Sequence, residues 1–159
     1  MRITKKGFTL LELLVVISII GILSALLLAN FNAARERARD TQRKGDIRNM
    51  QTALGVYYSD YGGFPTSGTG ANVGKIIGCS PPATPTLCNW GSSWIPETGK
   101  ILMSTLPKDP LSTQTYYYTQ TNLDTYSLQA CLENKSDDKA VYDANAAWCP
   151  SKYVYTVRP

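Results

Sequence analysis

Apolar residues dominate the first part of the chain. Residues 13–29 form a run of 17 without a charged side chain, and 8–31 supplies the ~20 residues that a helix needs to cross a bilayer. Nearly every face of such a helix is apolar, whereas a helix on a soluble core has one apolar face. The run also exceeds the roughly 7–15 apolar residues of a secretory signal peptide. We therefore predict a membrane-spanning helix over 8–31.

The pattern changes after residue 31. Apolar side chains now recur every three or four residues, which is typical of a helix that packs one face on a core. The sequence YGGFP at 61–65 interrupts this pattern, because glycine and proline disfavour continuation of a helix. We therefore expect the helix to continue over 32–61 as an amphipathic half. Its apolar stripe consists of Ile47, Met50, Leu54, Tyr57 and Tyr61.

The rest of the chain, 62–159, is rich in loops and contains three segments that read as strands. Tyrosine, threonine and valine are frequent in these segments, and such residues favour strands. A turn around Asn122 and Asp124 joins the first two segments. We expect an α+β fold in which the long N-terminal helix packs against a small antiparallel sheet, with 62–159 as a loop-rich β head. The segments are 115–119, 125–131 and 152–158.

Composition narrows the classes of function. The chain has 159 residues, a formal charge of +4 and no histidine. The missing histidine excludes Ser-His-Asp and Cys-His catalysis and removes the commonest metal ligand. We therefore expect no enzymatic activity and no cofactor.

Arginines are frequent in the amphipathic half of the helix. They lie mainly on faces other than the apolar stripe, and neighbouring carboxylates balance their charge. We interpret them as a solvated face near lipid headgroups; the weaker alternative is a DNA-binding face, as in a filament for DNA uptake. The basic residues are Arg35, Arg39, Arg43 and Arg48, and the acidic ones are Glu36, Asp40 and Asp46.

All four cysteines lie in the predicted head. Four cysteines allow three pairings, among which the sequence does not decide. We favour the local solution, which joins Cys79 to Cys88 and Cys131 to Cys149. The alternative, a metal site, lacks both a C-x-x-C spacing and a histidine. Because disulfides persist outside the cytoplasm, we expect an extracytoplasmic head and a cytoplasmic N-terminus.

One carboxylate, Glu12, interrupts the apolar run near its start. A charge inside a bilayer costs on the order of 2.5–3.5 kcal/mol on insertion scales, so an acid there is a functional candidate. Phe8 precedes it by four residues and lies on the same helix face. Cleavage after Gly7 would give Phe8 a free ammonium that pairs with Glu12 of its own or a neighbouring chain. The alternative is that Glu12 lies close enough to the interface to reach water.

The sequence KKGFTLLELLVV, which includes Lys5 and Lys6, resembles the leader junction of type IV prepilins. In that family a short basic leader ends in glycine, followed by phenylalanine and by a glutamate at the fifth mature position. The resemblance implies that a prepilin peptidase removes 1–7 by cleavage between Gly7 and Phe8, and that Phe8 is N-methylated. It also implies that Glu12 neutralises the amine of an adjacent subunit during assembly.

The same resemblance implies a function. We expect a structural subunit that self-assembles into a type IV pilus-like helical filament through its N-terminal helix. A membrane assembly platform, its ATPase and membrane lipid are the other implied partners. The subunit would be a single-pass protein of the cytoplasmic membrane before assembly and part of an extracellular or periplasmic filament afterwards.

A second resemblance concerns the head. The sequence LPKDP at 106–110, followed by a tyrosine-rich strand, is similar to the major pseudopilin of type II secretion. That protein is the first alternative function, and a DNA-uptake pilin is the second. Such pseudopilins commonly bind calcium near the C-terminus, where Asp137, Asp138 and Asp143 could supply ligands. Because the glycine-rich ligand pattern is absent, we favour a solvated acidic loop.

Overall fold

The chain forms an α+β fold, as the sequence predicts, with one long N-terminal helix followed by small antiparallel sheets. The structure is a computed structural model that describes residues 7–80, 85–97 and 99–159, without the side chains of 26–30. Two compact units are present, Met1–Glu36 and Arg37–Pro159.

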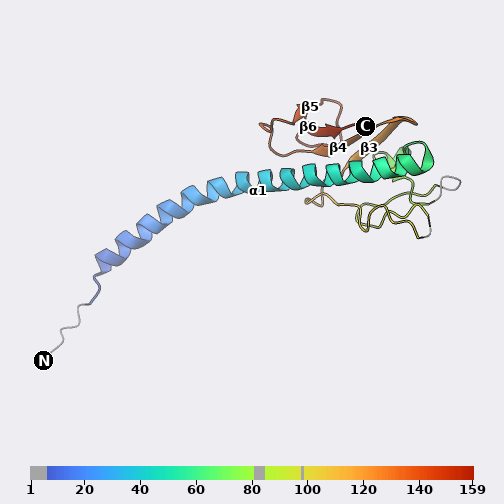
Figure 1. Cartoon of the computed structure of the whole chain (residues 1–159). Coiled ribbons are helices and arrows are strands. Elements are labelled where there is room, and N and C mark those ends of the chain that lie inside the picture. Colours follow the sequence, from blue (N-terminus) through green and yellow to red (C-terminus); the bar gives the residue numbers. More distant parts are fainter. Residues whose placement is uncertain (1–6, 81–84, 98) are drawn as a thin grey trace. The chain divides into compact units, whose positions relative to one another are not determined.

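Helix α1 spans Leu10–Tyr61 (Figure 1). Its end has a specific backbone cause. Gly62 has a φ of 72°, a left-handed conformation that glycine adopts without steric cost. Its N–H donates to the carbonyl of Tyr58 at 2.8 Å, which satisfies one of the last free carbonyls of the helix. The helix therefore ends at the residue that the sequence predicts.

In the first unit, the beginning of α1 is mostly apolar and uncovered. Every side chain from Gly7 to Ala25 is exposed, and Phe8 keeps 81% of its surface accessible. Over the described residues, no helix meets the combined length and hydropathy of a membrane span.

The second unit contains a four-stranded antiparallel sheet with the strand order β3-β4-β6-β5. Three of its strands overlap the predicted segments: β4 has the predicted bounds, β6 is one residue shorter at each end, and β3 begins and ends later than predicted. The fourth, β5, is a two-residue edge strand that the sequence did not reveal. The predicted turn is also present, because the N–H of Asp124 donates to Oδ1 of Asn122 at 2.9 Å. The strands are β3 (Tyr117–Asn122), β4 (Thr125–Cys131), β5 (Val141–Tyr142) and β6 (Tyr153–Val157).

A smaller two-stranded sheet follows the helix. Strands β1 (Thr66–Ser67) and β2 (Ile76–Ile77) pair antiparallel, and the short 3₁₀ helix η1 (Gly70–Asn72) lies between them. The bridge between Gly74 and Tyr118 links this hairpin to β3. This part of the region expected to be loops therefore has regular structure.

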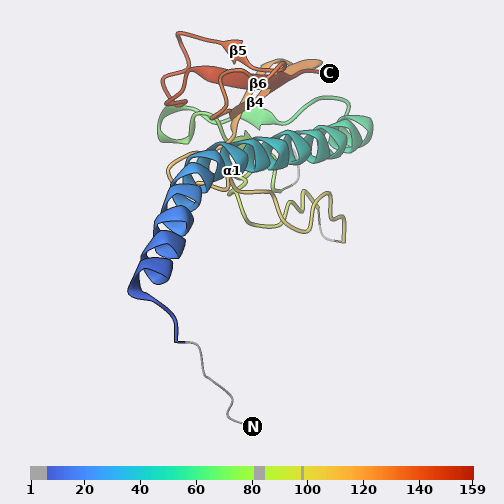
Figure 2. The ribbon, with the colours of Figure 1, turned by 90° about the vertical axis from the view of Figure 1, so that its left-hand side faces the viewer.

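The core of the second unit forms around the C-terminal part of α1. Figures 1 and 2 show the four-stranded sheet along one side of this part and the loop-rich segment after β2 along another. The apolar stripe faces this core as predicted, with Tyr61 partly buried at its edge. The largest buried apolar side chains include Ile47, Met50, Leu54, Trp94, Leu106, Tyr116, Tyr118 and Leu128.

Two disulfides stabilise the loops of the head. Cys79 bonds to Cys88, and Cys131 bonds to Cys149, which are the two local pairs. The second bond joins the end of β4 to the loop before β6, where both sulfur atoms are buried beside Val154. Closing loops of this size stabilises a chain by about 3 kcal/mol in the chain-entropy description.

Candidate functional site

The first candidate site is the start of α1. Thr9 precedes the helix, and both its backbone N–H and its hydroxyl donate to Oε2 of Glu12, at 2.8 Å and 2.9 Å. The N–H of Glu12 donates in return to the hydroxyl oxygen of Thr9 at 3.2 Å. This reciprocal arrangement is a capping box, which satisfies backbone donors that a helix start leaves free. Glu12 therefore has a local partner in its own chain.

Sequence reasoning missed this role, although its signal is present. A threonine followed three residues later by a glutamate, ahead of an apolar run, is the capping-box pattern. Of the residues expected at the leader junction, Gly7 and Phe8 lie just before the helix, while Lys5 and Lys6 lie outside the described residues. Within the chain, the structure places Glu12 in hydrogen-bond contact with Thr9.

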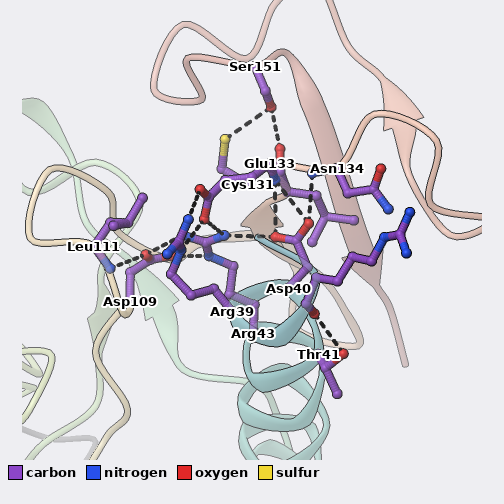
Figure 3. A network of polar contacts seen from close by, with 12 residues as sticks. Arg39, Asp40, Thr41, Arg43, Asp109, Leu111, Cys131, Glu133, Asn134 and Ser151 are labelled. Atoms are coloured by element: carbon purple, nitrogen blue, oxygen red, sulfur yellow. Dashed lines mark hydrogen bonds and ion pairs between the residues drawn. The ribbon is translucent and has the colours of Figure 1, made fainter. Parts of the chain in front are cut away.

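The second candidate site is a buried cluster of charges in the second unit (Figure 3). Arg43 has no exposed side-chain surface and pairs with the equally buried Asp109. The pair is bidentate, because Nε and Nη2 each donate to one carboxylate oxygen at 2.8 Å. We call this cluster the buried ionic network; it consists of Arg39, Asp40, Arg43, Asp109 and Glu133.

The other members complete the network around the same guanidinium. Nη1 of Arg43 donates to Asp40 at 2.7 Å and to Glu133 at 2.6 Å. Arg39 makes a second bidentate pair with Glu133, at 2.7 Å and 2.6 Å. Asp40 also accepts the backbone N–H groups of Glu133 and Asn134. The network therefore ties α1 to the residues after β4 and to the LPKDP loop.

The electrostatics follow from these contacts. Burial alone would lower the pKa of Arg43, but its hydrogen bonds to Asp109, Glu133 and Asp40 outweigh burial and raise that pKa above its ordinary value. The hydrogen bonds from Arg39, with the one from Arg43, lower the pKa of Glu133. Burial raises the pKa of Asp46, whose carboxylate accepts the hydroxyl of Tyr116 at 2.6 Å. Both shifts favour the charged forms of Arg43 and Glu133.

The network corrects the interpretation of the arginines as a solvated face. Arg43 is fully buried and Asp40 is 1% exposed, so neither faces solvent or lipid. Arg39 is partly buried against Glu133, whereas Arg35 and Arg48 are exposed as expected. The reason is that positions 40 and 43 continue the three-and-four spacing of the apolar stripe, and their charges are neutralised by carboxylates distant in sequence.

The acidic loop considered for calcium has other contacts. Asp137 pairs with Lys44 at 2.6 Å, and this hydrogen bond lowers the pKa of Asp137. Asp143 accepts the N–H of Asn145 at 2.9 Å, and Asp138 is exposed. In the described ranges, no three histidine, cysteine or acidic side chains gather as they would around a metal ion.

Comparisons with known proteins concern first the beginning of the chain. A family described as the prokaryotic N-terminal methylation motif matches residues 2–28. Type II secretion system core protein G of Pseudomonas aeruginosa is 32% identical over 143 residues, which are 87% of this chain and 94% of that protein. The chain belongs to the family of type IV pilins and type II secretion pseudopilins.

Further relatives of this pilin-like chain come from both branches of the family. Core protein G of Escherichia coli is 42% identical over 72 residues, covering 44% of this chain and 50% of that protein. A fimbrial protein of Neisseria meningitidis is 36% identical over 73 residues, covering 46% of this chain and 43% of that protein. No solved structure matches the chain. The pilin-like chain is thus a structural filament subunit, and its methylation motif implies self-assembly and processing by a peptidase.

Proposed function

We propose that the chain is a subunit of a type II secretion pseudopilus. The observation that carries this proposal is the relationship to core protein G, which extends over 94% of the Pseudomonas aeruginosa protein. The LPKDP sequence in the head supports the same branch of the family. The chain has no catalytic role in this proposal, since no histidine is present as a base. A type IV pilus subunit is the second candidate, favoured by the match to a fimbrial protein.

The processing step of the proposal is cleavage between Gly7 and Phe8, followed by methylation of the new Phe8 amine. The uncovered apolar helix of the first unit supports the next step, because such a surface requires lipid or another apolar helix around it. We place it in the cytoplasmic membrane before assembly and in the filament afterwards. An assembly platform and its ATPase would extract and stack the subunits.

In the assembly step, the carboxylate of Glu12 pairs with the amine of a neighbouring subunit. The capping box uses Oε2 of Glu12 for both bonds from Thr9, so the carboxylate retains its second oxygen as an acceptor. The capping N–H belongs to the peptide bond between Phe8 and Thr9, which lies beyond the cleaved bond. Processing therefore leaves the cap intact and adds an ammonium at Phe8. An ion pair between that ammonium and Glu12 of a neighbour is more favourable in an apolar filament core than either charge alone.

Cleavage is expected to change the mass and the charge of the chain. The mature chain has 159 − 7 = 152 residues, and loss of Arg2, Lys5 and Lys6 lowers the formal charge from +4 to +1. Intact-mass spectrometry of the chain from native membranes should show this species with one added methyl group. A chain that still begins at Met1 would contradict the processing step.

Deletion of the gene is expected to stop protein export in the native cells. Proteins that leave through type II secretion should accumulate inside the envelope, and a plasmid copy of the parental chain should restore their export. Electron microscopy of the parental cells, which contain the chain, should show no long surface filament that contains it. Long labelled filaments together with unchanged export would instead support the pilus branch.

A further inference from the structure

A hollow lined by cations lies along α1 in the second unit. Its volume is about 440 Å³. Lys44 on its wall is paired with Asp137 at 2.6 Å. Arg48 and Lys139 are exposed and have no ion-pair partner among the described residues. Because Asp138 is the one acidic residue of the lining, the hollow has an excess of positive charge. We call it the cationic hollow; its lining residues are Thr41, Lys44, Gly45, Arg48, Asp138 and Lys139.

Gly45 leaves the helix open on this wall. A Cβ built there would meet no atom within 4 Å outside the neighbouring helix backbone, so packing within the chain does not account for the missing side chain. Glycine is also a poor helix former. A group from another molecule can therefore come close to the helix at this point, beside the cations of the cationic hollow.

Carboxylates gather at a different level of the second unit, around the last turn of α1. The turn between β3 and β4 lies beside that helix turn (Figure 1), where the hydroxyl of Tyr58 donates to Oδ1 of Asp124 at 2.7 Å. Asp60 pairs with Lys100 at 2.8 Å, and Glu97 bridges to Lys100 through the backbone. The last turn of α1 contains no basic residue, and a helix C-terminus itself has a partial negative charge. Three carboxylates and one ammonium therefore leave this region negative.

The turn between β3 and β4 exposes one of these carboxylates. We call residues 122–124 the acidic turn. All three residues are exposed, and Leu123 keeps 66% of its surface accessible. Tyr58 uses one oxygen of Asp124, and no described residue donates to the other. The acidic turn thus offers a free carboxylate oxygen, which complements an unpaired arginine or lysine.

The acidic turn and the cationic hollow lie at separate levels of one helix. Tyr58 contacts the acidic turn and Lys44 lines the cationic hollow; they are 58 − 44 = 14 residues apart, which is about 20 Å along an α-helix. A second copy displaced by this length along the helix direction would bring its cationic hollow level with the acidic turn of the first. Such a contact joins two different surfaces, and its repetition gives a ring or an open helical filament.

We propose that the cationic hollow receives the acidic turn of a second copy of this chain, with Asp124 paired to Arg48 and Lys139. The proposal rests on the filament function, and the opposite charges of the two surfaces select a second copy as the occupant. An anionic lipid headgroup would meet the same cations, so it is an outcome that the test separates.

The first measurement exchanges the two charges. Arg48→Asp and Asp124→Arg should each lower the ratio of assembled filament to membrane-pool subunit by about fivefold, because like charges then oppose each other across the contact. The double variant restores opposite charges at every contact and should regain at least half of the parental ratio. A double variant no better than the weaker single variant would overturn the pairing.

Two controls separate the contact from other effects of these changes. Tyr58→Phe removes the hydrogen bond to Asp124 but keeps its charge, and Arg158→Asp makes the same charge reversal at another exposed position. Both should keep the ratio within about twofold of the parental value. A loss in Arg158→Asp as large as that in Arg48→Asp would overturn the local contact in favour of a general effect of net charge.

The second measurement uses filaments of the parental chain and needs no variant to fold. A carbodiimide joins a carboxylate to an amine in direct contact, with loss of water. It should yield covalent dimers in which mass spectrometry finds Asp124 joined to Lys139. Lys139→Arg keeps the positive charge but lacks the amine, so it should retain the filaments and lose this product.

The remaining outcomes identify what fails. Parental filaments whose crosslinked dimers lack Asp124 would overturn the acidic turn as the occupant and leave the filament function intact. Weaker binding of phosphatidylglycerol by Arg48→Asp in neutral detergent, without rescue of filaments by the charge exchange, would assign the cationic hollow to lipid and overturn the second copy. Absence of filaments from the parental chain would instead contradict the proposed function.

Discussion

Replacement of Arg43 by leucine should lower the free energy of unfolding of the head by about 3–5 kcal/mol, the cost of removing one partner from a buried ion pair. Asp40 keeps two backbone N–H donors and Glu133 keeps Arg39. Asp109 keeps one donor, the N–H of Leu111 at 2.8 Å, and becomes an uncompensated buried charge. Thermal unfolding of the full chain in detergent, followed by near-ultraviolet circular dichroism, should show a midpoint lower by on the order of 10 °C.

Two further variants show whether charge is the cause. Arg48→Leu, on the same helix but exposed, should change stability by less than about 0.5 kcal/mol. The double variant Arg43→Leu with Asp109→Asn removes the unpaired charge and keeps an acceptor for Leu111. It should regain at least half of the lost stability. If the double variant is as unstable as Arg43→Leu, lost packing rather than the unpaired carboxylate is the dominant cost.

Replacement of Glu12 by glutamine should reduce filament yield tenfold or more while leaving cleavage, disulfides and the fold of the head unchanged. The reason is that glutamine can still close a capping box with Thr9 but cannot neutralise the amine of a neighbouring Phe8. The measurement is the ratio of sheared filament to subunit in the membrane pool. Glu12→Asp should be intermediate at best, because its shorter side chain misplaces the carboxylate.

A matched variant separates the cap from the charge. Thr9→Val removes the capping hydroxyl, which costs about 1 kcal/mol at a helix start, and keeps the carboxylate. Its filament yield should fall much less than that of Glu12→Gln. Parental yields from Glu12→Gln would show that the carboxylate is not the assembly contact. Equal losses in both variants would contradict the prediction, because loss of the charge would then cost no more than loss of the capping hydroxyl.

The sequence predicts those parts of the fold that depend on local patterns. The apolar stripe predicts the amphipathic half of α1, and the glycines after Tyr61 predict where the helix ends. The alternation in 125–131 gives β4 within the bounds that the structure has. These elements have side-chain periods that short windows of sequence reveal, so the α+β class followed from them.

The parts that were missed depend on contacts between distant segments. Positions 40 and 43 carry charges, so the sequence predicts a solvated face there, although their spacing places them in line with the buried apolar stripe. Their neutralising partners, Asp109 and Glu133, lie in segments that no periodicity connects to the helix. Strand β5 and the β1–β2 hairpin are two residues per strand, too short for alternation to mark them. The capping box is the one missed feature that does not depend on distant segments. Thr9 and Glu12 are three residues apart, and this spacing is a recognisable capping-box pattern.

The buried pair of Arg43 and Asp109 also constrains how the sequence can diverge. The two residues are 66 positions apart, yet a change at either alone passes through an intermediate with one buried, unmatched charge. Related sequences should therefore replace both residues together or neither. Asp109 of the LPKDP loop and Arg43 of the helix should therefore change together in evolution, although they are far apart in the sequence.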